Sequence, residues 1–425
     1  MSRIALLSSE PVRPRMAGIG IRYLELARRL PEHGIDVVLL SPASPEESRQ
    51  LALPAGIDVR PFERGRLAAL LGDSDAAVAQ GQLANDLLLE VPDLPTAIDL
   101  YDPWLVENFA YADTLGSGVF RNDHATWVLQ MSRGDFFLCS SEEQRTFYLG
   151  FLAALGRVHP ERVKGDPDLE TLIAPVPFGV PGELPPHRPV LPVPMGVAGE
   201  KRLLFGGLYD WYDPWTLLDA LERLDRPSWV VYFIRNPNPE STPQRLWEEV
   251  ESRCRRLGWW GSRVRALDWT PADRRYDLLR DVDLLVAPHR PSLETRLSLR
   301  TRFLDALAAG CPVVTSEGGA MSRLLTEHRA GWVVPPGGAE ALARVLVVAV
   351  EDENEREARR QGGRELLTAF HWDRALAPLV RFCRDPWRDE TKDRFAHRPA
   401  VEVPADSLAW KIRRRLRRTF LGRAM

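Results

Sequence analysis

Short apolar runs alternate with amphipathic stretches along the first half of the chain. Residues 4–7 and 37–40 are apolar over the length of a buried strand, and residues 20–32 between them carry apolar side chains at helical spacing. Residues 75–80, 96–100 and 136–139 are further strand candidates. Because a helix between two strands returns the chain to the same edge, this order predicts a parallel sheet.

The same alternation repeats after a proline-dense segment, PVPFGVPGELPPHRPVLPVP, at residues 175–194. Strands are predicted at residues 202–205, 229–234, 264–266, 284–287 and 313–315. Proline-rich chain is extended and fairly stiff, so we assign residues 181–199 as a linker. The remainder divides into an N-terminal domain (1–180), a C-terminal domain (200–385) and a C-terminal extension (386–425). Two such α/β domains leave a cleft between them, where ligands commonly bind.

Residues 289–319, HRPSLETRLSLRTRFLDALAAGCPVVTSEGG, carry the strongest candidate chemistry. Thr301 can cap a short helix, and Gly310 suits the left-handed residue that ends one. The N-terminus of a helix presents unpaired N–H groups and a partial positive charge, which suit a phosphate. The pattern therefore predicts an anion site at this helix start.

Basic side chains surround the predicted helix start: Arg296, Arg300 and Arg302. Arginine can hold phosphate oxygens in a planar fork. Asp305, predicted on the same exposed face as Arg302, can accept hydrogen bonds from sugar or ribose hydroxyls. Together these groups predict binding of a nucleotide diphosphate-sugar. The alternative is an amphipathic helix with a solvated charged face.

Acidic and aromatic side chains follow the predicted strand at residues 96–100, where a parallel sheet faces its cleft. Asp102 can bind sugar hydroxyls or accept a proton, and Tyr101 or Trp104 can stack on a sugar. The alternative is that Asp102 caps a helix that Pro103 begins. One residue can do both.

Gly18 and Gly20 precede the first predicted helix, where a backbone can approach a ligand closely. The third glycine of a dinucleotide fingerprint is replaced by Tyr23. A tight turn alone would also explain both glycines, so the motif is weak evidence for a bound dinucleotide.

Composition narrows the class of protein. The 425 residues suit two domains, and a net charge of −3 gives no global attraction to nucleic acid. Four widely separated cysteines show no metal spacing, which predicts reduced thiols in a cytosolic protein: Cys139, Cys254, Cys311 and Cys383. We expect neither a signal peptide nor a membrane-spanning segment.

The end of the chain has a different pattern. Leu408, Ile412, Leu416 and Phe420 recur every four residues, and arginines and a lysine fill most positions between them. A basic amphipathic helix of this kind can lie on an anionic membrane surface, which we predict for residues 408–423. The alternatives are a helix packed on the protein or a disordered tail.

Three segments carry a family resemblance: MAGIGIRYLELARRLPEHGIDVVLLSP, LLFGGLYDWYDPWTLLDAL, and FLDALAAGCPVVTSEGG with the later AGWVVPPGG. Over most of residues 1–385, the chain resembles the family 4 glycosyltransferases of the GT-B fold. The resemblance implies an α/β fold with two Rossmann-like domains facing a cleft. It also implies sugar transfer from a nucleotide diphosphate donor with retention at the anomeric carbon. Neither a metal nor another cofactor is expected.

The chain departs from the family pattern in its charged residues. Of two acids eight residues apart, the second corresponds to Asp305, whereas the first falls at Leu297; Glu294 is the candidate replacement. The two cations that usually hold the diphosphate fall at Gly207 and Tyr212, which leaves that role to the arginines near residue 300. The departures indicate a divergent subgroup, such as those found in surface-polysaccharide gene sets.

We therefore expect a metal-independent hexosyl- or deoxyhexosyltransferase that acts on a glycan or lipid-linked acceptor. Under the mechanism that the resemblance implies, Asp102 orients the acceptor rather than attacking the donor. The expected location is the cytoplasm, peripherally on the inner face of the cell membrane. Two alternatives remain: a nucleotide-sugar epimerase of similar fold, and a non-catalytic module that binds glycans or tethers a partner to the membrane.

Overall fold

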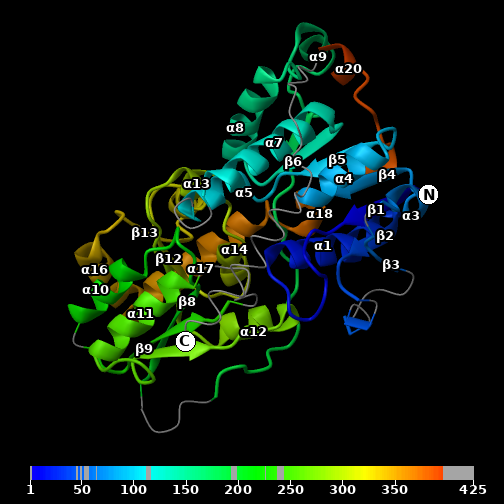
Figure 1. The fold of residues 1–425 in the computed structure, drawn as a ribbon. Coiled ribbons are helices and arrows are strands. Elements are labelled where there is room, and N and C mark those ends of the chain that lie inside the picture. Colours follow the sequence, from blue (N-terminus) through cyan, green and yellow to red (C-terminus); the bar gives the residue numbers. More distant parts are fainter. Residues whose placement is uncertain are drawn as a thin grey trace.

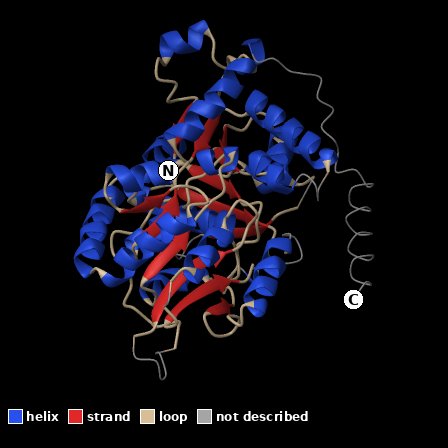
Figure 2. Cartoon of the chain, turned by 90° about the vertical axis from the view of Figure 1, so that its left-hand side faces the viewer, coloured by secondary structure: helices blue, strands red, loops and turns tan. Residues whose placement is uncertain are grey.

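The computed structural model contains two parallel sheets flanked by helices (Figures 1 and 2). It describes residues 2–395 except 45, 48–49, 52–56, 64, 112–115, 193–198, 225 and 237–243. The predicted membrane-binding segment, residues 408–423, lies outside the described residues. Within them, no helix combines the length and apolar character needed to cross a bilayer.

The first sheet has seven strands in the order β3-β2-β1-β4-β5-β6-β7. Its strands are β1 (Arg3–Leu7), β2 (Asp36–Ser41), β3 (Asp58–Pro61), β4 (Ala76–Ala79), β5 (Thr96–Asp99), β6 (Phe136–Cys139) and β7 (Ile173–Pro175). Side chains of β1 alternate between the faces: Ile4 and Leu6 join one apolar cluster, and Ala5 and Leu7 join the other. Both faces are therefore covered, as a parallel sheet requires.

The helices of this part are α1 (Gly18–Arg29), η1 (Leu30–His33), α3 (Leu67–Leu70), α4 (Gln82–Glu90), α5 (Trp104–Glu107), η2 (Asn108–Tyr111), α7 (Ser117–Arg133), α8 (Glu142–Ala154) and α9 (Pro160–Gly165). Gly34 ends the first helical segment with φ of 76°, the left-handed conformation that favours glycine. Helix α1 packs against β1 and β2, and α8 packs against β6 and β7.

The second sheet has six strands in the order β10-β9-β8-β11-β12-β13. Its strands are β8 (Lys201–Gly207), β9 (Trp229–Ile234), β10 (Val264–Leu267), β11 (Leu284–Ala287), β12 (Val313–Ser316) and β13 (Gly331–Val334). Its helices are α10 (Pro214–Glu222), α11 (Arg245–Arg256), η3 (Ala272–Arg274), α12 (Arg275–Arg280), α13 (Leu293–Leu297), α14 (Thr301–Ala308), α15 (Ala320–Glu327), α16 (Ala339–Glu351) and α17 (Glu353–Leu367). The two sheets thus confirm the predicted pair of parallel α/β domains.

The described part of the predicted linker is held against the second domain. The Asp281 carboxylate accepts hydrogen bonds from the backbone N–H groups of Val190 and Leu191, at 2.5 and 2.8 Å. The same carboxylate lies 2.8 Å from a ring nitrogen of His187. This stretch of the proline-rich segment therefore follows α12 instead of spanning open solvent.

The chain then returns to the first domain through α18 (Trp372–Ala375), α19 (Ala377–Arg384) and α20 (Lys392–Phe395). Phe382 of α19 stacks on Phe136 of β6, with ring centroids 5.5 Å apart. Leu376, Leu379 and Phe382 belong to an apolar cluster of the first sheet. Helices α18 and α19 therefore pack with the N-terminal domain, although the sequence boundary at residue 385 placed them in the C-terminal one.

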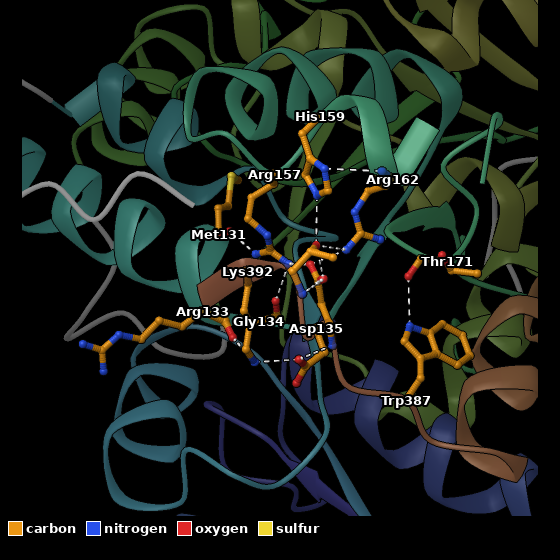
Figure 3. A network of polar contacts seen from close by, with 12 residues as sticks. Met131, Arg133, Gly134, Asp135, Arg157, His159, Arg162, Thr171, Trp387 and Lys392 are labelled. Atoms are coloured by element: carbon orange, nitrogen blue, oxygen red, sulfur yellow. Dashed lines mark hydrogen bonds and ion pairs between the residues drawn. The ribbon is translucent and has the colours of Figure 1, made fainter. Parts of the chain in front are cut away.

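Buried ion pairs fix the last described residues to the first domain (Figure 3). Asp389 lies 2.6 Å from Arg157, and the two side chains are 2% and 0% exposed. Asp389 also pairs with Arg162, and Lys392 lies 2.6 Å from Asp135. Burial alone would raise the pKa of Asp389, but the two arginines and nearby hydrogen bonds hold it below its ordinary value.

Candidate functional site

The two domains touch where the ends of β5 and β8 meet α13 and α14. The Tyr101 hydroxyl donates to the backbone oxygen of Leu299 across the gap, at 3.2 Å. The rings of Tyr111 and Trp211 meet edge to face, with centroids 6.0 Å apart. Helix α13 packs against α5 of the first domain. The chain beside the predicted Asp102 and Arg300 therefore lies at a domain boundary.

Helix α14 begins in this region without a side-chain cap. Arg300 precedes it with an extended backbone (φ −74°, ψ 100°), and no side chain accepts from the first turn. Thr301 is the first helical residue, so the predicted Thr301 cap is wrong by one position. The Phe303 N–H donates to the Arg300 backbone oxygen at 3.0 Å, and the N–H groups of Thr301 and Arg302 remain for an anion.

Arg302 is held by the end of β8. Its Nη1 donates to the backbone oxygens of Phe205 and Gly207, at 3.2 and 3.5 Å. Its guanidinium carbon lies 4.4 Å from the Tyr212 ring centroid, which is cation–π distance. Gly206 has φ of 92°, and a Cβ there would lie 2.8 Å from Arg302 Nη1. Glycine is therefore required at position 206 if Arg302 is to occupy this place.

Arg300 pairs with Glu294 of α13. Its Nη2 lies 2.5 Å from Glu294 Oε2, and the side chains are only 9% and 4% exposed. Its guanidinium carbon also lies 5.3 Å from the Tyr212 ring centroid. Glu294 Oε1 is buried and has no hydrogen-bond partner among the described residues. A buried carboxylate oxygen of this kind is suited to accept a bond from a bound ligand.

His289 lies beside these arginines and was not identified from the sequence. Its Nδ1 lies 3.0 Å from Thr315 Oγ1, and that hydroxyl donates to the Ala287 oxygen at 2.9 Å. The hydrogen bonds therefore assign the ring proton to Nδ1 and a lone pair to Nε2. Burial, followed by the charges of Arg300 and Arg302, lowers the pKa of His289 well below its ordinary value, so the ring is neutral. The sequence signal that could have identified His289 is its position just after the apolar run of β11.

Asp305 does not lie on an exposed face, and that prediction is wrong. The residue is 8% exposed, and its Oδ1 lies 3.3 Å from Nε of Arg275. Arg275 also reaches within 4.0 Å of Glu25 on α1, across the domain boundary. Burial raises the pKa of Asp305, and Arg275 partly offsets that effect. Asp305 is thus paired within the protein in this structure.

Arg296 is exposed on α13, whereas Glu294 of the same helix is buried in its pair with Arg300. The next residue, Leu297, is 5% exposed and belongs to an apolar cluster of the first domain. A leucine where the resembling family carries an acid therefore has a packing role. It holds α13 against the N-terminal domain.

The N-terminus of α1 is occupied by a protein carboxylate. Glu10 accepts hydrogen bonds from the backbone N–H groups of Ala17 and Gly20, at 2.6 and 2.8 Å. Gly18 and Gly20 lie within the first turn of α1, not before it. A Cβ at Gly20 would lie 2.9 Å from Met16 Cβ, so packing explains this glycine.

Asp102 lies at the domain boundary after β5. Burial and the negative charge of Asp99 raise its pKa to about 7, although Arg22 opposes the shift. Helix α5 begins at Trp104, after Pro103, without a side-chain cap, so the alternative that Asp102 caps this helix is wrong. The structure leaves Asp102 without that structural explanation.

The aromatic residues beside Asp102 are already engaged. Arg22 lies 4.4 Å from the Tyr101 ring centroid, and Tyr101 is 7% exposed. The Trp104 ring meets Trp127 edge to face at 5.9 Å. Tyr101 therefore has a structural role in this arrangement, and its predicted stacking on a sugar finds no open ring face.

Glu107 of α5 is a further acid of this region that the sequence analysis did not single out. Burial, then the charges of Asp102 and Glu294, raise its pKa well above the ordinary value. The sequence signal that could have identified Glu107 is its position five residues after Asp102. Among the described residues, no three histidine, cysteine, aspartate or glutamate side chains are grouped as a metal site requires.

Comparisons with known proteins find a family match within the second domain. Residues 200–352 match the family described as Glycosyl transferases group 1. Over 174 residues, the chain is 29% identical to D-inositol 3-phosphate glycosyltransferase of Jonesia denitrificans. That match covers 39% of this chain and 38% of the relative, so the chain spans well under two thirds of the relative's length.

Solved structures resemble nearly the whole chain. Sucrose-phosphate synthase from Thermosynechococcus elongatus has a TM-score of 0.66 at 14% identity, covering 90% of this chain and 98% of that chain. Anabaena Alr3699/HepE in complex with UDP-glucose has a TM-score of 0.64 at 17% identity, covering 90% and 100%. At such identities the likeness concerns the fold, and it confirms the predicted GT-B arrangement.

Proposed function

We propose, on the premise of the match of residues 200–352 to the glycosyl transferases of group 1, that the protein transfers a sugar from a nucleotide diphosphate donor. The acceptor in this proposal is a glycan or a lipid-linked chain of a surface polysaccharide. The anomeric configuration of the donor is retained. The donor sugar is a hexose or deoxyhexose.

One observation carries the proposal: two arginines stand at the uncapped start of α14, at the domain boundary. Arg302 is bound by backbone oxygens and a ring face, and its Nε and Nη2 find no acceptor in the described part of the chain. These N–H groups and the helix start suit diphosphate oxygens. We assign the diphosphate to Arg300, Arg302 and the first turn of α14.

The donor sugar would then lie toward Glu294. Its Oε2 holds Arg300 at 2.5 Å, and its buried Oε1 would accept a hydrogen bond from a sugar hydroxyl. This assignment gives Glu294 the role that an acid at position 297 has in the resembling family. Asp305, paired with Arg275, is a weaker candidate for a ribose contact, because a ligand would have to compete with that pair.

In the proposed reaction, the bond from the anomeric carbon to the phosphate oxygen breaks, and a bond to the acceptor oxygen forms on the same face. The acceptor proton passes to the departing phosphate. Arginines and helix N–H groups stabilise the charge that develops on that phosphate, so the reaction needs no metal ion. Asp102 orients the acceptor hydroxyl without forming a covalent bond.

A thermal-shift panel of nucleoside diphosphates and their sugars tests the proposal. A ligand that binds only the folded protein raises its melting temperature. The proposal expects at least one nucleoside diphosphate to do so, and its sugar to do so further. No shift with any nucleotide would favour the non-catalytic alternative. Conversion of a nucleotide-sugar without an acceptor would instead identify an epimerase.

We also propose that residues 408–423 bind an anionic membrane surface from the cytoplasmic side. The apolar residues that recur every four positions in this segment, with basic residues between them, support the proposal. Deleting residues 408–425 should release the protein from phosphatidylserine vesicles and leave nucleotide binding intact. Equal vesicle binding by the truncated protein would contradict it.

A further inference from the structure

Tyr212 lies between the basic side chains of the proposed diphosphate site. Its ring centroid is 4.4 Å from the guanidinium carbon of Arg302, 5.3 Å from that of Arg300 and 4.9 Å from the ring of His289. The residue is 2% exposed. Tyr212, which follows β8, is therefore a shared neighbour of three groups from the end of β11 and the start of α14.

The ring is itself fixed from two sides. The Tyr212 N–H donates to the Tyr209 oxygen at 2.9 Å, which closes the turn after β8. The Phe205 ring meets the Tyr212 ring edge to face, with centroids 5.8 Å apart. A bridge between the backbones of Tyr212 and His289 ties the same turn to the end of β11. The ring thus forms a rigid surface for the arginines.

The two arginines need such a surface, because they are two residues apart and carry like charge. Glu294 offsets the charge of Arg300, whereas Arg302 is bound by two neutral carbonyl groups. An aromatic face attracts a guanidinium group, and the attraction grows when the pair is removed from water. The Tyr212 ring therefore offsets the repulsion without adding a negative charge that would repel a diphosphate.

We infer that Tyr212 is the positioning residue of this site, whose ring face holds Arg300 and Arg302 ready for a diphosphate. The inference rests on the proposed function. It explains why an aromatic residue stands where the resembling family carries a cation: here the positive charge comes from α14, and the loop after β8 supplies its support. The ring is the active part, so the hydroxyl group is dispensable.

Calorimetric titration with inorganic pyrophosphate tests the inference without knowledge of the donor base. Tyr212→Leu should weaken pyrophosphate binding about tenfold, whereas Tyr212→Phe, the matched control, should change it by no more than about twofold. UDP, GDP and ADP are titrated beside UMP, GMP and AMP. Tyr212→Leu should lower the affinity for the diphosphate that binds and leave its monophosphate unchanged, a difference that general structural damage does not produce.

Should Tyr212→Leu fail to fold, Tyr212→Met takes its place, because a flexible apolar chain refills the volume. In an Arg302→Ala background, the Tyr212 substitution should lose most of its effect on pyrophosphate. If Arg302→Ala weakens binding and Tyr212→Leu does not, the inference is overturned while the proposed function stands. If Arg302→Ala binds pyrophosphate as wild type does, the proposed diphosphate site itself is overturned.

Discussion

Glu294 and Arg300 form an ion pair of 2.5 Å whose side chains are 4% and 9% exposed. Breaking a buried pair leaves the remaining charge without a partner, which costs more than the pair contributes. In Glu294→Gln, we expect the free energy of unfolding to fall by about 2–4 kcal/mol. Urea denaturation measures it.

The same substitution should increase the stabilisation by pyrophosphate, because Arg300 then lacks a competing anion. It should also abolish any additional stabilisation by a donor sugar. Glu340→Gln, which breaks an exposed pair with Arg344, is the control and should change stability by less than about 1 kcal/mol. A smaller pyrophosphate effect in Glu294→Gln than in wild type would count against this account.

The ionised carboxylate of Asp102 destabilises the folded state, because the folded chain raises its pKa to about 7. The folded state holds a proton that the unfolded state has lost between about pH 4 and pH 7. The resulting loss of stability grows as pH rises through that range and is complete above it. Asp102→Asn should therefore be more stable than wild type at pH 8, by on the order of 1–3 kcal/mol. At pH 4 this difference in the free energy of unfolding should be smaller.

Sugar transfer by Asp102→Asn should nevertheless fall by at least about tenfold, while donor binding is kept. Melting at several pH values and product formation with a bound donor measure the two effects. Gains in both stability and transfer would remove Asp102 from the site.

Leu297 joins α13 to the first domain. Leu297→Ala should lower the free energy of unfolding by about 2–4 kcal/mol, because it leaves a cavity in an apolar contact. Leu297→Glu, which restores the acid of the resembling family, should destabilise the fold further by burying a charge. Leu293→Ala on the same helix is the control, since Leu293 is 41% exposed. An active, stable Leu297→Glu protein would contradict this interpretation.

Asp389 forms ion pairs with two arginines of the first domain, Arg157 and Arg162. Asp389→Asn should cost about 3–5 kcal/mol at pH 7, because Arg157 stays buried without a counterion. Since the wild-type pKa is depressed, the difference between the proteins should shrink as acid protonates Asp389. Arg388→Gln breaks only an exposed pair with Asp93 and should have little effect. Denaturant unfolding at pH 7 and at about pH 2, below the ordinary aspartate pKa of about 4, tests both statements.

The fold was predictable where strands are short, apolar and buried on both faces, as at β1, β2 and β6. Strand β3 was missed because its half-buried Asp58 and Arg60 break the apolar pattern. Strand β7 was missed because only three residues pair. The spacing of apolar residues reports burial, so edge strands and very short strands give a weak signal.

The arginines and Glu294 of the candidate site could be singled out from the sequence, but their contacts could not. The position of Arg302 depends on Gly206 and Tyr212, about ninety residues away in the chain, which no local pattern reveals. Asp305 was assigned to an exposed face because helical spacing does not show that Arg275 of α12 covers it. The role of Leu297 likewise appears only once the two domains are placed together.

The structure of the protein with a bound nucleoside diphosphate is the most direct test of the central claim. The account predicts that phosphate oxygens lie within hydrogen-bond distance of the Arg302 guanidinium and the first N–H groups of α14. A diphosphate bound elsewhere in the chain, with Arg300 and Arg302 unchanged and out of reach, would contradict it.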